Sequence, residues 1–446
     1  MHDSPWQPDP ILGLNPLWLS ATLLVIVYVF IISERVNRAV IALLGAVLMV
    51  MTGVLDQPTA VAGIDFNTLA LLIGMMVMVA VTGESGLFQF VAIWAAKRVK
   101  ASPAGVLIMI GLVTALFSAL LDNVTTALLI TPITLLIVEE LRVPALPYLI
   151  MIILSANIGG TATLIGDPPN ILIGSATRLN FVDFIVNLTP VVVVIMALLL
   201  GLFYLFWGRR LKAEPQHRAR VMNFEERRAI KDARLVRQSL AVLGLVMVGF
   251  VGGHQMGLEP GTVALGGAAL LLLLHTAGQH AEQQTETVNH IFSKVEWVTI
   301  FFFAGLFILV TGVERAGLLE RLGEGLLHLT EGEPQATALL ILWSSAVLSA
   351  VLDNIPFVAT MIPLIQSLAP AFGGPEALEP LWWALSLGAC LGGNGSLIGA
   401  SANLTVAAMA SQYHQPIRFV TFLWIGFPVM LATVAVATGY LYLRYL

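Results

Sequence analysis

Three aspartates lie in apolar surroundings in this chain, at positions where the spacing of neighbouring residues points to chemistry. Asp122 and Asp353 each precede an asparagine, in the sequences LLDNVTT and VLDNIPF, and Asp167 ends the glycine-rich sequence NIGGTATLIGD. A carboxylate inside hydrocarbon is costly unless it is paired, hydrated or protonated, so an ionisable residue there indicates a path for ions or protons. The three aspartates are therefore our candidates for proton coupling.

Uncharged polar residues accompany these carboxylates and are expected to line one cavity near the middle of the membrane. They are Asn123, Thr125, Thr126, Asn157, Thr161, Asn170, Asn354, Asn394, Ser396, Ser401 and Asn403. No Arg or Lys stands near them in the sequence, and a strongly anionic substrate normally requires a fixed cation or sodium. The set therefore favours a neutral hydroxylated solute or a cation. Asp167 is replaced by Ala400 in the second half of the chain, so it is the distinctive proton-coupling candidate.

The composition predicts the elements that must position these residues. The chain has 446 residues, of which 58% are hydrophobic and 11% are charged, whereas soluble proteins carry about 25% charged residues. Long apolar stretches predict about ten or eleven helical spans of roughly 20 residues each. The alternation typical of a membrane barrel is missing. We therefore expect an all-α integral membrane protein.

An internal repeat relates the two halves of the chain. Asp122-Asn123 aligns with Asp353-Asn354, and Pro132 aligns with Pro363 at the same spacing. Gly159-Gly160, Gly166 and Asn170 find counterparts in the same order at Gly392-Gly393, Gly399 and Asn403. Matched blocks at a nearly constant offset identify two structural repeats.

The flanking charges predict that the two repeats are inverted. Basic residues flank the Asp122 block and acidic residues flank the Asp353 block, so each block is expected to enter and leave the membrane by one face, as a re-entrant helical hairpin. The glycines at 159–160 and 392–393 predict that a helix stops there, and Gly166 is expected to let the chain turn. Asp167 followed by two prolines predicts an N-cap and a new helix, and Asn403 is expected to begin its counterpart. These segments then form two discontinuous transmembrane helices, with irregular backbone that is tolerable only beside a cavity.

The expected organisation has five parts: an external N-terminus with scaffold helices (1–65), a first transport repeat with the following span (66–207), a basic cytoplasmic linker (208–237), scaffold helices of the second half (238–294), and a second, inverted repeat with the last span (295–446). The clustered cations of the linker place it in the cytoplasm and both termini outside. We expect a multi-pass protein of a bacterial or archaeal inner membrane. A nucleic-acid partner is not expected, because the basic run is short and mixed with acids.

The sequences LDNVTT and NIGGTATLIGDPPN, in that order, resemble the arsenical-pump and P-protein branches of a large ion-transporter superfamily. That superfamily also holds sodium/proton antiporters and dicarboxylate carriers, and the resemblance covers residues 66–410. It implies an arsenite/antimonite efflux permease in which each repeat supplies a re-entrant hairpin and a broken helix to one central site. Dicarboxylate carriers usually have Ser-Asn-Thr at the hairpin tips, whereas this chain has Asp122-Asn123 and Asp353-Asn354.

The function implied is secondary active export of arsenite and antimonite in exchange for protons, by alternating access. Both metalloids form neutral trihydroxides, which agrees with a site rich in amides and hydroxyls. A sodium/proton antiporter is the main alternative, since paired Asp and Asn at broken helices also suit a bare cation, and an anion permease is a third.

An enzyme is not expected, because the chain has neither a Walker-type phosphate loop nor the paired Gly-x-Gly-Asp motifs of an intramembrane aspartyl protease. The expected partners are a small inorganic substrate, protons and the lipid bilayer, with no metal and no cofactor. A soluble ATPase subunit and a homodimer are both compatible with the sequence, which requires neither.

Overall fold

The structure is a computed structural model that describes residues 8–10, 13–33, 35–177 and 179–446, and every regular element in these ranges is a helix. The first half contains α1 (Pro16–Ser33), α2 (Arg38–Met51), α3 (Gln57–Ala62), α4 (Phe66–Glu84), α5 (Leu87–Arg98), α6 (Pro103–Leu120), α7 (Asn123–Leu141), α8 (Leu146–Gly160), α9 (Pro168–Ala176), α10 (Phe181–Phe203) and the π-helical turn η2 (Tyr204–Gly208). Two short helices of the linker follow, α11 (Pro215–Met222) and α12 (Glu226–Ala229).

The second half contains α13 (Ala233–Gly252), the 3-10 turn η3 (Gly253–Met256), α14 (Pro260–Thr276), α15 (Ala281–Phe292), α16 (Trp297–Arg315), α17 (Leu318–Leu329), α18 (Pro334–Val351), α19 (Asn354–Ser367), α20 (Ala369–Phe372), the 3-10 turn η4 (Pro375–Leu378), α21 (Glu379–Gly392), α22 (Ser401–Gln412) and α23 (Phe419–Arg444). The all-α prediction is confirmed.

Nine helices of the described ranges are long and apolar enough to cross a membrane, and three shorter apolar helices (α2, α8 and α14) accompany them. The sequence predicted ten or eleven spans. The numbers differ because the two interrupted helices are divided into the short pairs α8/α9 and α21/α22, and because α2, α14 and α19 are also shorter than a complete span.

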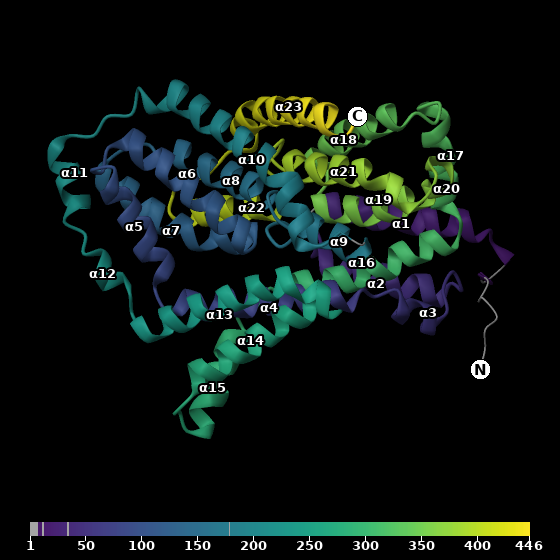
Figure 1. The fold of residues 1–446 in the computed structure, drawn as a ribbon, viewed down its shortest axis with the longest axis horizontal. Helices are drawn as coiled ribbons and strands as arrows, with labels where there is room; N and C mark the ends of the chain where they lie inside the picture. The colour runs from purple at the N-terminus through teal and green to yellow at the C-terminus, as the bar shows by residue number, and fades with distance from the viewer. Residues whose placement is uncertain (1–7, 11–12, 34, 178) are drawn as a thin grey trace.

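The helices form two layers (Figure 1). In one layer, which we call the scaffold layer, α2 packs against α16, α4 packs against α14, and α13 lies beside α14. The other layer, which we call the transport layer, holds the two hairpins and the two interrupted helices, with α23 at its outer side. In it α6 packs against α8, and α18 packs against α21 at the equivalent place of the second repeat.

Each hairpin turns at a Leu-Asp pair that separates two helical arms. The first arm α6 ends at Leu120 and the second arm α7 begins at Asn123, with Asp122 as its N-cap. The arms α18 and α19 meet in the same way, with Asp353 as the N-cap of α19. An aspartate that accepts from the free N–H groups of a helix start stabilises that start, which explains why the helix is interrupted there. That these hairpins enter and leave a membrane by one face stays a prediction.

The two interrupted helices stop at the predicted glycines. Helix α8 ends at Gly160 and α9 begins at Pro168, while α21 ends at Gly392. Helix α22 begins at Ser401, two residues before the expected Asn403. The backbone between the paired helices is irregular, in the segments 161–167 and 393–400.

The structure shows that glycine is needed at position 166 for another reason than the one expected from the sequence. We expected it to allow a turn, but its φ is not in the left-handed region. A Cβ atom at Gly166 would instead lie 2.6 Å from the carbonyl oxygens of Gly160 and Ser118. Its counterpart Gly399 has the same close neighbours in the second repeat, the carbonyl oxygens of Gly393 and Ser349, each at 2.9 Å. The glycine is therefore required by close backbone packing.

The two repeats are interleaved at the centre of the transport layer. Helix α7 of the first hairpin packs against α22 of the second interrupted helix, and α19 of the second hairpin packs against α9 of the first. Each hairpin tip therefore meets backbone from the other repeat.

The linker helices α11 and α12 lie beside α5 at one end of the molecule, which we call the linker face (Figure 1). Lys97 of α5 donates to Glu226 of α12 at 2.5 Å and to the Phe224 carbonyl oxygen at 2.9 Å. Helices α17 and α20 lie at the opposite end. The cytoplasmic location of the linker face stays a prediction.

Candidate functional site

A chain of asparagine side chains links the two repeats at the centre of the molecule. Nδ2 of Asn123 donates to Oδ1 of Asn157 at 3.2 Å. Nδ2 of Asn157 donates in turn to Oδ1 of Asn394 at 3.0 Å and to Oδ1 of Asn403 at 2.9 Å. All four residues are buried, with at most 2% of their surface exposed. The first hairpin tip, the end of α8 and the second helix break thus meet in one amide cluster.

Asn170 and Asn403 hold the two irregular loops in place. Nδ2 of Asn170 donates to the carbonyl oxygens of Thr161 and Thr163 at 3.1 and 2.9 Å. Nδ2 of Asn403 donates likewise to the carbonyl oxygens of Gly393 and Ser396 at 2.7 and 2.9 Å. Buried carbonyl groups in irregular backbone need such partners. The N–H groups of both asparagines therefore stabilise the two loops, while their side-chain oxygens face the other residues of the site.

Asp122 is bound within its own hairpin. Its Oδ1 accepts from the backbone N–H of Thr125 at 2.7 Å, and its Oδ2 accepts from the Thr125 hydroxyl at 2.5 Å. The backbone N–H of Asn123 donates to the Gly166 carbonyl oxygen at 3.1 Å, which joins the hairpin tip to the loop that carries Asp167. Asp122 thus acts as the N-cap of α7.

Asp167 lies at the start of α9 but does not cap it, contrary to the sequence prediction. Its side chain makes no hydrogen bond to the helix start, and Oδ1 instead accepts from Nδ2 of Asn354 at 3.3 Å. Its Oδ2 has no hydrogen-bond partner among the described residues, and the side chain is fully buried. The donor to this side chain therefore comes from the second hairpin tip and not from the start of α9. Asp167 is consequently the least compensated of the three candidate carboxylates.

Asp353 is paired with an arginine, which corrects the expectation that no cation lies near the site. Nη1 of Arg38 lies 2.8 Å from Oδ2 of Asp353 and donates to the Ser401 hydroxyl oxygen at 2.5 Å. Arg38 precedes Asp353 by 315 positions and begins α2 in the scaffold layer, so only tertiary packing brings it there.

The remaining predicted residues divide between the fold and the cavity walls. The hydroxyls of Thr161 and Ser396 donate to the carbonyl oxygens of Asn157 and Ala350 at 2.8 and 2.5 Å, and they therefore support the backbone. Thr125 and Ser401 are half-buried and line two different cavities.

Three buried residues of the cluster were not selected from the sequence. The Ser386 hydroxyl donates to Oδ1 of Asn170 at 2.6 Å, and Sγ of Cys390 lies 3.7 Å from the same oxygen. The Thr163 hydroxyl donates to the Ala119 carbonyl oxygen at 2.6 Å, just as Ser396 bonds to Ala350. The repeat alignment could have identified Thr163, which aligns with Ser396, and Cys390, which aligns with Asn157.

Four buried polar atoms around the cluster have no hydrogen-bond partner among the described residues: Oδ1 of Asn123, Oγ1 of Thr126, Oδ2 of Asp167 and Nδ2 of Asn394. Leaving such atoms unpaired is costly, so native proteins usually pair them with protein, water or a ligand. The four atoms offer both acceptors and a donor, and none of them belongs to a cation.

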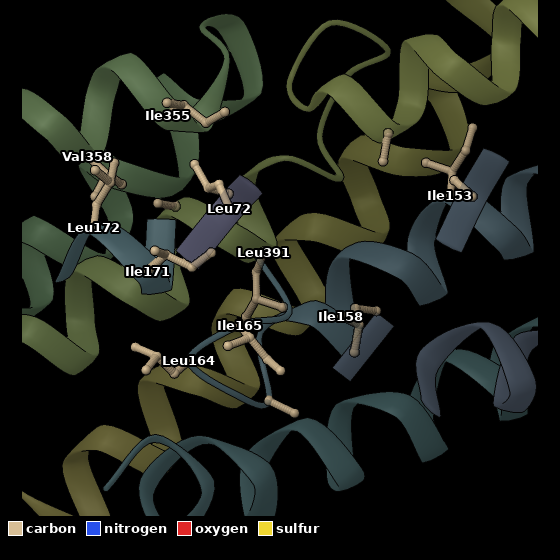
Figure 2. Packing of buried hydrophobic residues seen from close by; sticks show 14 of the residues in the cluster. Leu72, Ile153, Ile158, Leu164, Ile165, Ile171, Leu172, Ile355, Val358 and Leu391 are labelled. Carbon is tan, nitrogen blue, oxygen red and sulfur yellow. The ribbon is translucent and has the colours of Figure 1, made fainter. Parts of the chain in front are cut away.

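Apolar side chains surround this polar centre. Figure 2 shows Leu164 and Ile165 of the first irregular loop near Leu391 of α21, with Ile171 at the start of α9 close by. These side chains are at least 98% buried. Apolar packing strengthens electrostatic interactions inside the site and excludes bulk water from it.

Two cavities lie between the layers beside the hairpin tips. A cavity of about 320 Å³ is lined by Tyr28, Arg38, Glu296, Asp353, Ser401 and Thr405, among others. A second cavity of about 610 Å³ is lined by Glu84, Thr125, Lys231, His290, Lys294 and Glu296, among others. Glu296 lines both cavities. It is exposed and directly precedes α16, in the short connection from α15.

Comparison with known proteins identifies a family model and several relatives that are similar to this chain. The family model described as citrate transporter matches residues 28–388. An uncharacterized transporter of Mycobacterium bovis is 41% identical over 431 residues, which cover 96% of this chain and 98% of the relative. A 46 kDa membrane protein of Mycobacterium leprae is 38% identical over 432 residues, with 96% and 99% covered.

The human P protein is a further relative, 34% identical over 508 aligned positions that cover 95% of this chain. The match spans 59% of the length of the P protein. Among solved structures, the YdaH transporter of Alcanivorax borkumensis, described as having an unusual topology, has a TM-score of 0.59 at 15% identity. The similarity covers 96% of this chain and 98% of that one, and it supports the fold alone.

Proposed function

This chain belongs to the citrate transporter family and is a multi-pass membrane transporter, and on that premise we propose that it is a proton-coupled secondary carrier working by alternating access. We place the linker face in the cytoplasm because ten of the chain's 22 Lys and Arg residues lie between Arg209 and Arg237. The proton is carried by Asp167, whose Oδ2 has no partner among the described residues.

The solutes that fit this site best are arsenite and antimonite, exported as neutral trihydroxides. The supporting observation is the set of unpartnered atoms on Asn123, Asn394 and Asp167, which combine acceptors with an amide donor. A small neutral trihydroxide both donates and accepts hydrogen bonds, so it can satisfy such atoms without a fixed cation. The resemblance of the motifs to the arsenical-pump branch agrees with this choice.

A carboxylate anion is the second candidate, and Arg38 is the specific observation that favours it. The guanidinium lies beside Asp353 and Ser401 at the wall of the 320 Å³ cavity. The description of the family as citrate transporters points the same way. Against it, Arg38 is already neutralised by Asp353, so an anion would have to displace that carboxylate.

The test is uptake into inverted membrane vesicles with an acidic lumen, offered arsenite, antimonite, sodium and citrate separately. Accumulation of the metalloids that depends on the proton gradient and is lost in Asp167→Asn would support the proposal. Citrate movement without metalloid movement would overturn it in favour of anion transport. Sodium movement alone would transfer the function to cation/proton exchange on the same fold.

A further inference from the structure

Arg38 connects four helices at the wall of the 320 Å³ cavity. Nη2 donates to the Thr299 hydroxyl oxygen on α16 at 2.9 Å, and the guanidinium carbon lies 5.3 Å from the centre of the Phe302 ring. Nη1 bonds to Asp353 at the tip of the second hairpin and to Ser401 at the start of α22. Thr299 and Phe302 belong to the scaffold layer, whereas Asp353 and Ser401 belong to the transport layer. The ion pair therefore crosses from one layer to the other.

The sequence explains why Asp353 needs a partner from outside its hairpin. Asp122 is satisfied by Thr125, which supplies both a backbone N–H and a hydroxyl. The position equivalent to Thr125 in the second repeat is Pro356, which has neither a backbone N–H nor a hydroxyl. The contact of Asp353 with its own helix is a long one, 3.4 Å from the backbone nitrogen of Ile355. The carboxylate is thus left to accept from Arg38 and Ser401.

Among the residues that the structure describes, the other repeat has no equivalent ion pair. Helix α14 packs against α4 as α2 packs against α16, so α14 is the counterpart of α2. Helix α14 begins with Pro260, whereas α2 begins with Arg38, so α14 has no cation at its first position. An ion pair that exists on one side only favours one of two inverted states over the other.

The ion pair is also accessible enough to break. The side chains of Arg38 and Asp353 are 24% and 14% exposed, and both line the cavity. A fully buried pair would resist separation far more strongly, because both charges would lose their compensation. Access from the cavity lets water replace each partner as the layers shift.

We propose that Arg38 and Asp353 form a latch between the layers that stabilises the state in which this cavity is open. The proposal rests on the alternating-access function, in which the two layers must shift relative to one another, so that bonds between them cannot all persist. It makes Arg38 a positioning residue, and it makes Asp353 a fixed counter-charge that does not carry the transported proton.

The experiment follows cavity access by cysteine labelling, which requires no transported solute. The single natural cysteine is removed as Cys390→Ser, and Thr405→Cys is introduced at the cavity wall. Inverted vesicles are treated with a membrane-impermeant maleimide, and the labelling rate is measured. Tyr413→Cys, exposed just beyond the end of α22, is the matched control for reagent access.

Arg38→Met should slow labelling of Thr405→Cys by about tenfold, the shift expected when charge-assisted hydrogen bonds are lost from one of two states. The reversed pair, Arg38→Asp with Asp353→Arg, should restore the rate toward that of the parent. Pro356→Thr should slow labelling as well, because it offers Asp353 the local cap that Asp122 has. Labelling of Tyr413→Cys should remain constant throughout.

Unchanged labelling in both Arg38→Met and Pro356→Thr would overturn the latch, and so would a reversed pair that behaves like Arg38→Met. Pro356→Thr keeps the test decisive if Arg38→Met fails to fold, because it removes no charge. A failure of the proposed function would look different. In that case no solute would move in the parent protein, although labelling would still respond to the substitutions.

Discussion

Asn354 at the tip of the second hairpin donates from Nδ2 to Oδ1 of Asp167, 187 positions earlier in the chain, at 3.3 Å. The contact joins the hairpin of one repeat to the helix break of the other. It leaves Oδ2 of Asp167 without a partner among the described residues. A hydrogen bond from an amide N–H favours the ionised form of a carboxyl group, whereas burial favours the protonated form, so the two effects on Asp167 oppose one another. The contact therefore suits a carboxyl group that must gain and lose a proton.

Replacing Asp167 by asparagine should abolish coupling while leaving the fold intact. Asparagine reproduces the size and neutrality of a protonated aspartate but cannot exchange a proton. We expect solute accumulation driven by a proton gradient to fall to the level of empty vesicles. Exchange of solute across the membrane without a gradient should persist, and isotope exchange in proteoliposomes measures it.

The matched control for this variant is Asp65→Asn. Asp65 caps α4 by accepting from the backbone N–H groups of Asn67 and Thr68, away from the amide cluster. Asparagine is about as good a helix cap as aspartate, so coupling should survive. Equal loss of coupling in both variants would contradict a specific role for Asp167.

Asn157→Ala should weaken solute binding and also destabilise the fold. Removing the amide leaves Asn123, Asn394 and Asn403 each without a hydrogen bond that Asn157 now makes. Each buried group left unpaired costs about 1–3 kcal/mol of folding stability. Because Asn123 and Asn394 also lose the partner that orients their amides, we expect KM to rise by at least about tenfold. Initial transport rates over a range of solute concentrations measure this change.

Asn187→Ala provides the comparison, because it removes a different buried asparagine. Oδ1 of Asn187 accepts from Arg444 at 2.8 Å and from Tyr445 at 2.5 Å, at the end of α23. We expect the melting temperature to fall in this variant and KM to stay constant. A rise in KM of the same size would show that any lost buried amide disturbs binding.

Gly166→Ala should destabilise the protein through a backbone collision. The added Cβ atom would lie 2.6 Å from two carbonyl oxygens, and neither belongs to a side chain that can turn away. Overpacking of this kind costs about 1–3 kcal/mol or more. Gly201→Ala in α10 is the control, since no atom lies within 4 Å of its added Cβ. Thermal unfolding in detergent should separate the two variants, and equal melting temperatures would contradict the close-packing explanation.

Lys97→Met should release the linker from α5. The hydrogen bond from the Lys97 ammonium holds the pKa of the Glu226 carboxyl below its ordinary value of 4.5. Because the pKa is lowered in the docked state, the ionised Glu226 stabilises docking of the linker at pH values above 4.5. This stabilisation is lost as the pH falls below 4.5 and the carboxylate is protonated. We therefore expect faster amide hydrogen exchange in residues 223–229 of the variant at pH 7. The difference from the parent should shrink below pH about 4.5.

Arg228→Met is the control for this measurement. Arg228 pairs with Glu225 inside the linker, so its loss removes a charge without breaking the contact with α5. Exchange in the linker should then stay close to that of the parent. Comparable acceleration in both variants would mean that linker charge, and not docking to α5, controls exchange.

Glycine, proline and aspartate made much of the architecture predictable from the sequence. Asp122 caps α7, α8 ends at Gly160 and α9 begins at Pro168, because these residue types act on the backbone locally. The alignment of the repeats predicted that Asn170 and Asn403 are equivalent, and both bind the carbonyl oxygens of their loops. Local chemistry and repetition therefore predicted the elements that frame the site.

The partners of individual side chains were not predictable in the same way. Arg38 belongs to none of the sequence motifs, and only the packing of α2 on α16 brings it to Asp353. Asp167 had the sequence of a helix cap, yet its hydrogen-bond donor comes from the other repeat. Both outcomes depend on contacts between residues that are distant in the chain, for which one sequence without relatives carries no signal.

The interleaving of the repeats has a consequence for biogenesis. Asn157 finds its partners Asn394 and Asn403 only 237 and 246 positions later in the chain. At roughly 5–20 residues per second, a ribosome needs about 12–50 s to synthesise that interval. During this time the first repeat carries an unsatisfied amide in its apolar interior, so water or the insertion machinery has to shelter it. The hydrogen bonds of the central amide cluster can therefore form only after nearly all of the helices have left the ribosome.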